Sequence, residues 1–128
     1  MDPAPIRLRV LIADDDEAFA KVMALYLRTC GCAVTIVLGG RPLLAALGDE
    51  DFDLVVADVL MPDLPGTDAC ADAAAAGIDV PFVFMTADCD PELLARGRAL
   101  SGRSVIRKPF QLERLDAVLQ ARRESSRR

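Results

Sequence analysis

Short apolar segments alternate with amphipathic segments along most of this chain. The apolar segments have the length and unbroken character of strands that are buried on both faces. They are Leu8–Ala13, Ala33–Val37, Leu54–Ala57, Phe82–Met85 and Ser104–Arg107. Segments of helical character follow them, at Glu17–Thr29, around Pro42–Leu47, and at Thr67–Ala76, Pro91–Leu100 and Gln111–Arg123. This alternation predicts an α/β fold in which right-handed crossovers place helices on both faces of a parallel sheet.

The first helical segment shows the signals most clearly. Its apolar side chains recur at i, i+3, i+4 and i+7, which predicts an amphipathic helix over Glu17–Thr29. Those side chains are Phe19, Val22, Met23, Tyr26 and Leu27. We expect the carboxylate of Asp16 to cap this helix by accepting the free amide hydrogens of its first turn. Gly31 is expected to end it.

Polar residues stand where four of the five predicted strands end. In chain order they are the triplet Asp14-Asp15-Asp16, then Asp58, Thr86 and Lys108. Because the carboxyl ends of parallel strands lie at one edge of a sheet, these side chains are expected to converge there. Crowded carboxylates need a cation or protons, and oxygen ligands without thiolate or imidazole favour Mg²⁺. The pattern therefore predicts a site for a divalent cation and a phosphoryl group.

The composition excludes several other kinds of site. The chain has no histidine, so it holds no phosphohistidine, no histidine-based triad and no histidine-ligated metal. It also lacks G-x-G-x-x-G after the first strand and the phosphate loop G-x-x-x-x-G-K-[ST]. The four cysteines fall in three separate regions, at positions 30, 32, 70 and 89. A zinc site would need all of them, so we expect reduced thiols that serve as small packing residues.

Length and charge fit one compact domain. With 128 residues and 52% hydrophobic content, the chain is expected to form a single domain over 1–128, with its core at about 7–122 and a frayed basic C-terminal tail. No apolar stretch reaches membrane-spanning length, and the first residues lack a secretory pattern, so a cytoplasmic protein is expected. Residues 96–128 hold ten bases and three acids. The four arginines of the tail are too few and lack aromatic neighbours, which argues against nucleic-acid binding, but a basic partner-docking face stays open; they are Arg122, Arg123, Arg127 and Arg128.

Four motifs carry a family resemblance. They are Val10–Asp16 (VLIADDD), Asp58–Gly66 (DVLMPDLPG, of the form D-x-x-M-P-x-x-x-G), Met85–Ala87 and Lys108–Phe110. In this order and at these separations, the chain resembles bacterial response-regulator receiver domains of two-component signalling, from Leu8 to Leu119. The resemblance implies a flavodoxin-like fold, a doubly wound five-stranded parallel sheet of order 2-1-3-4-5 with five helices, as in chemotaxis regulators.

The resemblance also implies a phosphoacceptor and a metal site. Asp58 would receive a phosphoryl group from a histidine kinase, from a phosphotransfer protein or from a small acyl phosphate. Mg²⁺ would be bound by Asp15, Asp58 and the main-chain carbonyl of Leu60, with Asp14 binding directly or through water. Phosphoryl transfer depends on positioning and on neutralising oxygen charge, which agrees with this set of residues.

The same resemblance assigns the residues that would contact the phosphoryl group. These are the Thr86 hydroxyl, the Ala87 amide and the Lys108 ammonium. The chain has only two lysines, at positions 21 and 108, and a compact ammonium suits a crowded phosphate site. Pro109 is expected to follow a cis peptide bond that aims Lys108 inward.

One position departs from the family pattern. Receivers commonly carry an aromatic residue three positions before the lysine, and this chain has Val105 there. A branched aliphatic side chain cannot swing between buried and exposed positions as a ring does. We therefore expect the face formed by the fourth helix, fifth strand and fifth helix, where a downstream protein would bind, to respond differently or weakly to phosphorylation.

Three functions remain to be weighed. The first is a phosphorylatable switch that is not itself an enzyme beyond limited self-phosphorylation and autodephosphorylation. The second is a small Mg²⁺-dependent phosphatase that works through an aspartyl phosphate. Such enzymes carry a second Asp two positions after the nucleophile, where this chain has Leu60. The third is an unphosphorylated receiver-like docking module, which the acids, Thr86 and Lys108 oppose and Val105 slightly favours.

Overall fold

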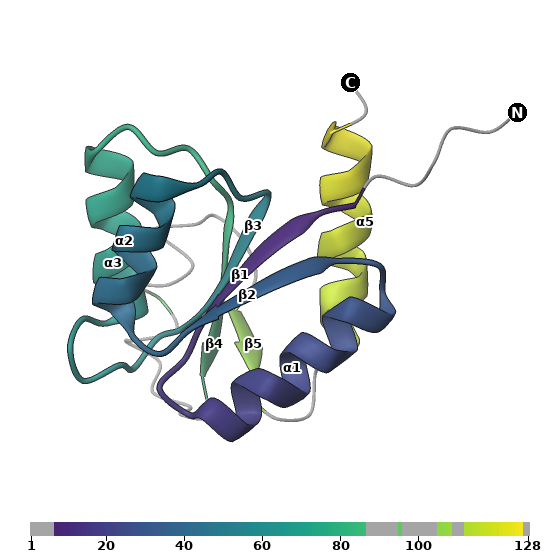
Figure 1. Cartoon of the computed structure of the whole chain (residues 1–128), viewed down its shortest axis with the longest axis horizontal. Coiled ribbons are helices and arrows are strands. Elements are labelled where there is room, and N and C mark those ends of the chain that lie inside the picture. Colours follow the sequence, from purple (N-terminus) through teal and green to yellow (C-terminus); the bar gives the residue numbers. More distant parts are fainter. Residues whose placement is uncertain (1–6, 87–94, 96–104, 109–111, 127–128) are drawn as a thin grey trace, which may run out of the picture.

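Five parallel strands form one sheet in the order β2-β1-β3-β4-β5 (Figure 1). The computed structural model describes residues 7–86, 95, 105–108 and 112–126. The strands are β1 (Arg9–Ala13), β2 (Ala33–Val37), β3 (Leu54–Asp58), β4 (Phe82–Thr86) and β5 (Val105–Arg107). The helices described in full are α1 (Glu17–Thr29), α2 (Gly40–Asp49), α3 (Gly66–Ala75) and α5 (Arg114–Ser126).

The sequence prediction of the fold is confirmed. The predicted sheet order is the observed one, and every strand pair is parallel. The bounds of α1 and β2 are those that the pattern predicts, and the other described elements lie within three residues of their predicted positions. The helix predicted at Pro91–Leu100 lies almost wholly outside the described residues. Of that segment only Ala95 is described, and it is helical.

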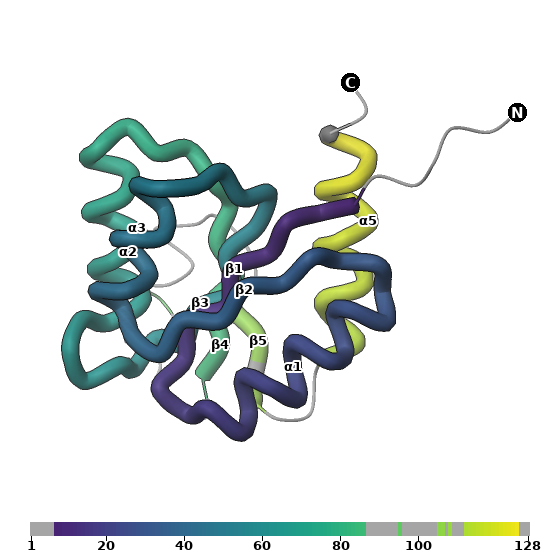
Figure 2. The backbone as a smooth tube through the Cα atoms, in the orientation of Figure 1, coloured from purple at the N-terminus to yellow at the C-terminus, as the bar shows by residue number. Residues whose placement is uncertain are grey.

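The sheet separates two hydrophobic cores, because successive side chains of a strand point to opposite faces. Val10 and Ile12 of β1 pack with α1 and α5, whereas Leu11 and Ala13 pack with α2 and α3. Both figures show α1 and α5 on one side of the sheet and α2 and α3 on the other (Figures 1 and 2). Burial on both faces explains why the strands read as unbroken apolar segments.

Helix α1 forms where its signals predict, with one exception on its apolar face. Asp16 is the N-cap, and its Oδ1 accepts a hydrogen bond from the Phe19 amide at 3.1 Å. Met23 and Leu27 are buried against the sheet. Val22 is 56% exposed, so its assignment to the buried face was wrong. Met23 and Ala24, the next two residues, are buried, so Val22 lies beyond the edge of the buried stripe, which i+3 spacing alone cannot resolve.

The three cysteines within the described residues are free thiols. Cys32 is buried, whereas Cys30 and Cys70 are half-buried beside the two cores. These thiols pack as small apolar side chains, as expected. None of the helices in the described segments is both long enough and apolar enough to cross a membrane.

Candidate functional site

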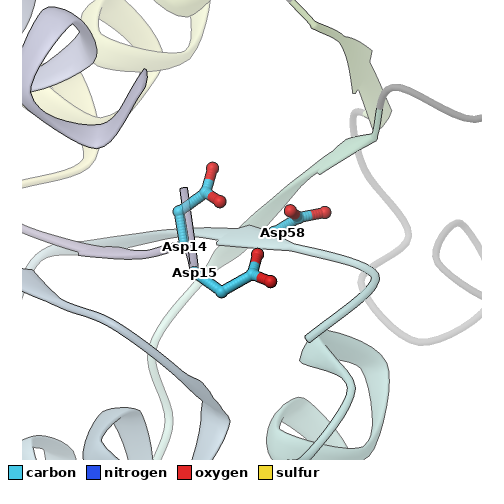
Figure 3. A group of neighbouring side chains, drawn as sticks. All are labelled: Asp14, Asp15 and Asp58. Atoms are coloured by element: carbon cyan, nitrogen blue, oxygen red, sulfur yellow. The ribbon is translucent and has the colours of Figure 1, made fainter. Parts of the chain in front are cut away.

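Three carboxylates meet at the carboxyl edge of the two central strands. Asp14 and Asp15 follow β1, and Asp58 is the last residue of β3. The parallel register pairs Ala13 with Ala57, which places the two strand ends side by side. One carboxylate oxygen from each of the three residues lies within 4.8 Å of the others (Figure 3). The predicted convergence of these acids is therefore observed.

Lys108 follows the last residue of β5, and its side chain contacts two of these acids. Its Nζ lies 2.7 Å from Asp14 Oδ2 and 2.8 Å from Asp58 Oδ2. The Lys108 amide donates to the Thr86 carbonyl oxygen at 3.0 Å, so the backbone is fixed to the end of β4. The side chain is only 11% exposed. A single ammonium thus compensates two buried carboxylates.

Asp14 is the most deeply buried member of the site. Its side chain is 1% exposed, and its Oδ1 accepts a hydrogen bond from the Asp16 amide at 2.9 Å. Burial raises the pKa of Asp14 and the charge of Asp58 adds to this, while Lys108 and the Asp16 amide oppose it. Burial by itself lowers the pKa of Lys108, but its contacts with Asp14 and Asp58 outweigh burial and raise that pKa. The lysine is therefore held as an ammonium.

Asp15 forms the open side of the site, and Asp58 lies between it and the deeply buried Asp14 in exposure, with a side chain that is 9% exposed. Asp58 Oδ1 accepts the Leu60 amide at 3.1 Å, and its Oδ2 accepts a hydrogen bond from Lys108 Nζ. Asp15 is exposed, and Leu60, two residues after Asp58, is 47% exposed. The structure therefore assigns the Leu60 amide to Asp58, while the metal role of the Leu60 carbonyl stays a prediction.

The remaining predicted residues lie at or beyond the ends of β4 and β5. Thr86 is 1% exposed at the last position of β4, next to the backbone of Lys108. Val105 is half-buried in β5 and packs against the core that α2 and α3 share. Ala87 and Pro109 lie outside the described residues, so the amide contact and the cis peptide stay predictions.

Phe19 is a site residue that the sequence analysis missed. Lys108 Nζ lies 4.8 Å from the centroid of the Phe19 ring, on the first turn of α1. A ring face attracts a cation and leaves it no water on that side. Phe19 therefore limits where the ammonium can move. Its helical spacing indicated only a core position.

Asp63 is the second residue that the sequence analysis missed. Its carboxylate accepts the amides of Gly40 at 3.1 Å and Arg41 at 2.9 Å, and so caps α2 from the loop between β3 and α3. The Arg41 and Gly40 amides hold the pKa of Asp63 below its usual value. The cap fastens the loop that carries Leu60, directly after Asp58. A Cβ on Gly40 would lie 2.2 Å from the Leu64 carbonyl oxygen, so this approach requires glycine.

Gly66 explains the glycine of the D-x-x-M-P-x-x-x-G motif. Its amide donates to the Val59 carbonyl at 3.0 Å, which folds the start of α3 back onto the end of β3. A Cβ at this position would lie 2.2 Å from the carbonyl oxygen of Asp58. Any larger residue would therefore push the backbone that positions the Asp58 carboxylate.

The donor set fits a Mg²⁺ ion. Oxygens bound to one Mg²⁺ lie about 2.1 Å from it, so opposite ligands are at most about 4.2 Å apart. The three carboxylate oxygens lie within 4.8 Å of one another, so only a shift of less than an ångström or one bridging water is needed. Every donor is a hard oxygen atom, and Asp15 leaves the site open to solvent.

The comparisons with known proteins agree with this geometry. Residues 10–120 match the response regulator receiver domain family. The DNA-binding response regulator MtrA of Mycobacterium tuberculosis is 32% identical over 117 residues, which are 91% of this chain and 51% of that protein. The transcriptional regulatory protein RprY of Bacteroides fragilis is 30% identical over 115 residues, 90% of this chain and 49% of that protein. The chain thus spans about half the length of these two relatives.

A solved structure supports the same fold. The receiver domain of the Francisella response regulator 1452 superposes with a TM-score of 0.85 and 22% identity, and the match covers 94% of this chain and 99% of that one. At this identity the likeness concerns the fold alone. The family match extends over most of the sequence and includes all four motifs of the site. The chain therefore belongs to the response regulator receiver domains, the phosphorylatable domains of two-component systems.

Proposed function

We propose that Asp58 is the phosphoacceptor of this receiver, and that a histidine kinase or a phosphotransfer protein donates the phosphoryl group from a phosphohistidine. One observation carries the proposal above the others. Among the described residues, Asp58 and Asp14 both contact Lys108, but the Asp58 side chain keeps 9% exposure while that of Asp14 is 1% exposed, and Asp15 does not contact the lysine.

In the transfer, a carboxylate oxygen of Asp58 forms a bond to phosphorus as the phosphorus–nitrogen bond of the donor breaks. The electron pair leaves with the imidazole. The Leu60 amide and Lys108 hold the carboxylate in one orientation, so little reorganisation is needed before attack. Lys108 then contacts the new phosphoryl oxygens, and the Thr86 hydroxyl, one strand away, would donate to them.

The same proposal includes a bound Mg²⁺ ion, held by Asp14, Asp15 and Asp58 with the Leu60 carbonyl. When bound, the ion supplies positive charge against the phosphoryl oxygens, which is the main requirement of phosphoryl transfer. We propose in addition that the protein acts as a switch in the cytoplasm. It has only limited self-phosphorylation and autodephosphorylation activity.

Incubation with acetyl phosphate and Mg²⁺, followed by intact mass measurement, tests the acceptor. We expect one phosphate adduct in the natural chain, and none in Asp58→Asn or in the presence of EDTA. Asp15→Asn serves as a second control, because it keeps the acceptor and weakens the metal site. An adduct that persists in Asp58→Asn would place the acceptor elsewhere and refute the proposal.

We further propose that the output face at β5 and α5 responds weakly to phosphorylation, because Val105 occupies the position of the usual aromatic switch. Val105 is half-buried beside the core and pairs with Phe84 of β4, and its branched side chain cannot swing between buried and exposed positions as a ring does. Amide chemical shifts of α5 are to be compared with and without a beryllofluoride mimic, in the natural chain and in Val105→Tyr. A full response in the natural chain, equal to that of the variant, would contradict this idea.

A further inference from the structure

A pocket lies at the opposite end of the sheet from the acids, where β1 and β2 begin. It is an open pocket of about 700 Å³, walled by the turn Cys30–Cys32 and by Arg7, Arg28 and Arg123. The three arginines come from separate parts of the chain: the residues before β1, the last turn of α1 and the C-terminal half of α5. The volume lies in the range of small-molecule sites.

Within the described segments, the three arginines of this pocket form no direct ion pair with a carboxylate, although Asp116 Oδ1 lies 4.0 Å from Cys30 Sγ at its wall. Arg9 lies near the same end, but it is neutralised by Glu50 at 3.3 Å. Three unpaired guanidinium groups around one concavity are unexpected in a chain whose formal charge is −5. They produce a local positive potential that attracts anions.

The hydrogen bonds of these arginines leave donors unused. Arg28 Nη2 donates to the Val34 carbonyl at 3.3 Å, and Arg123 Nη2 donates to the Cys30 carbonyl. Each guanidinium has five N–H donors, so most remain available. The Nε of Arg123 is buried and makes no hydrogen bond. Because this atom is inaccessible from the pocket, an oxyanion there would instead accept hydrogen bonds from the exposed guanidinium groups of Arg7 and Arg28 and from the remaining donors of Arg123.

Stabilisation of the end of α1 explains only part of this arrangement. Arginine donors neutralise carbonyl groups at a helix C-terminus, which accounts for the contact of Arg123 with Cys30. It does not account for the third arginine, at position 7. Gly31 adopts a φ of 87° and carries no side chain, so no side chain from this residue projects into the pocket.

We propose that this pocket binds a small phosphorylated molecule, whose phosphate groups pair with Arg7, Arg28 and Arg123. The planar guanidinium fork matches phosphate oxygens in a bidentate manner, and three permanent charges favour a multiply charged anion over a single carboxylate. The thiol side chains of Cys30 and Cys32 provide a less polar wall for the rest of the molecule. The ligand would join α1, α5 and the start of β1.

Titration monitored by amide chemical shifts tests the proposal, with inorganic pyrophosphate and ADP as the two probes. EDTA is present throughout, so that neither probe binds through a cation at the acidic site. We expect saturable shifts centred on Cys30, Gly31 and Cys32, for pyrophosphate alone or for both probes. If pyrophosphate binds and ADP does not, the pocket recognises the phosphate anion alone. If ADP binds more strongly, the less polar wall formed by Cys30 and Cys32 also contacts the rest of the ligand.

Single-charge variants separate specific binding from general attraction. We expect Arg28→Gln and Arg7→Gln, both of exposed residues, to weaken binding about tenfold each, equivalent to about 1.4 kcal/mol. Arg41→Gln removes the same charge on α2 and should leave the affinity within twofold. No saturable shift at the turn, or equal weakening by Arg28→Gln and Arg41→Gln, would overturn the proposal. Because the pocket lies away from Asp58, the Asp58→Asn variant should bind equally, and failure of phosphorylation would leave this result unaffected.

Discussion

Replacing Lys108 by methionine tests whether one ammonium holds the acidic site together. Methionine keeps the apolar length of the side chain and removes the charge. In the natural chain, Nζ lies 2.7 Å from Asp14 Oδ2 and 2.8 Å from Asp58 Oδ2, and the three side chains are 11%, 1% and 9% exposed. The variant leaves two buried carboxylates facing each other without a counter-charge.

The expected loss follows from this burial. Removing one partner of a buried ion pair costs about 3–5 kcal/mol, because the remaining charge is left uncompensated. Access to water through Asp15 places the expected value near the lower end, at about 3 kcal/mol. A domain of this size has an unfolding free energy of about 5–15 kcal/mol, so the loss is large enough to measure.

Urea unfolding at neutral pH in EDTA is the assay, with Lys21→Met as the matched control. Lys21 is the only other lysine, and its ion pair with Glu17 at 3.2 Å joins two exposed side chains of α1. That exposed pair should contribute at most about 0.5 kcal/mol. Excess Mg²⁺ should restore more stability to Lys108→Met than to the natural chain, because the ion replaces the missing charge.

The pH dependence gives a second, independent reading of the same variant. The pKa of Asp14 is raised in the folded chain, so its protonation stabilises the fold below the unfolded value and this stabilisation is lost as pH rises through the folded pKa. Lys108 holds the pKa of Asp14 down, so without it that pKa should rise further and more stability should be lost as pH rises. The gap between variant and natural chain should therefore be widest at neutral pH and narrow on acidification. A variant as stable as the natural chain at neutral pH in EDTA would refute the reasoning.

Three further predictions concern contacts around the site and on α1. Asp63→Asn should lower the urea midpoint at neutral pH, and this difference should shrink as pH falls, because the lowered pKa of Asp63 stabilises the fold only while the carboxylate is charged. Gly66→Ala should cost about 1–3 kcal/mol in thermal unfolding, since its Cβ would meet the Asp58 carbonyl oxygen. In absorbance titration, Tyr26, the only tyrosine, should ionise at a lower pH in Asp116→Asn, because the hydrogen bond to Asp116 at 2.5 Å raises its pKa.

The elements and the acidic edge could be predicted because they depend on local pattern and on one topological rule. Strands buried on both faces read as unbroken apolar segments, and β3 and β4 are buried at every position. The N-cap Asp16 contacts Phe19, only three residues away, so a local motif contains both partners. Convergence of Asp14, Asp58 and Lys108 required only that the strands be parallel.

The missed residues make contacts that no local pattern contains. Asp63 caps a helix that begins 23 residues before it, and from sequence it reads as an ordinary turn residue. Phe19 contacts a lysine at the far end of the chain, and its spacing indicates only a buried helix face. Val22 was wrong for the opposite reason, since a local period cannot tell the centre of an apolar stripe from its edge.

Lys108 connects the acidic site to the backbone at the ends of β4 and β5. A phosphoryl group on Asp58, as proposed above, would compete with Asp14 for the same ammonium, while the centroid of the Phe19 ring lies 4.8 Å from Lys108 Nζ on the α1 side. The Lys108 amide is bonded to the Thr86 carbonyl, so a shift of the lysine backbone pulls on the ends of β4 and β5 together. A change from 1% to 99% of an active state needs about 5.5 kcal/mol of differential binding. Redistribution of this one buried ion pair is of the right size to supply much of it.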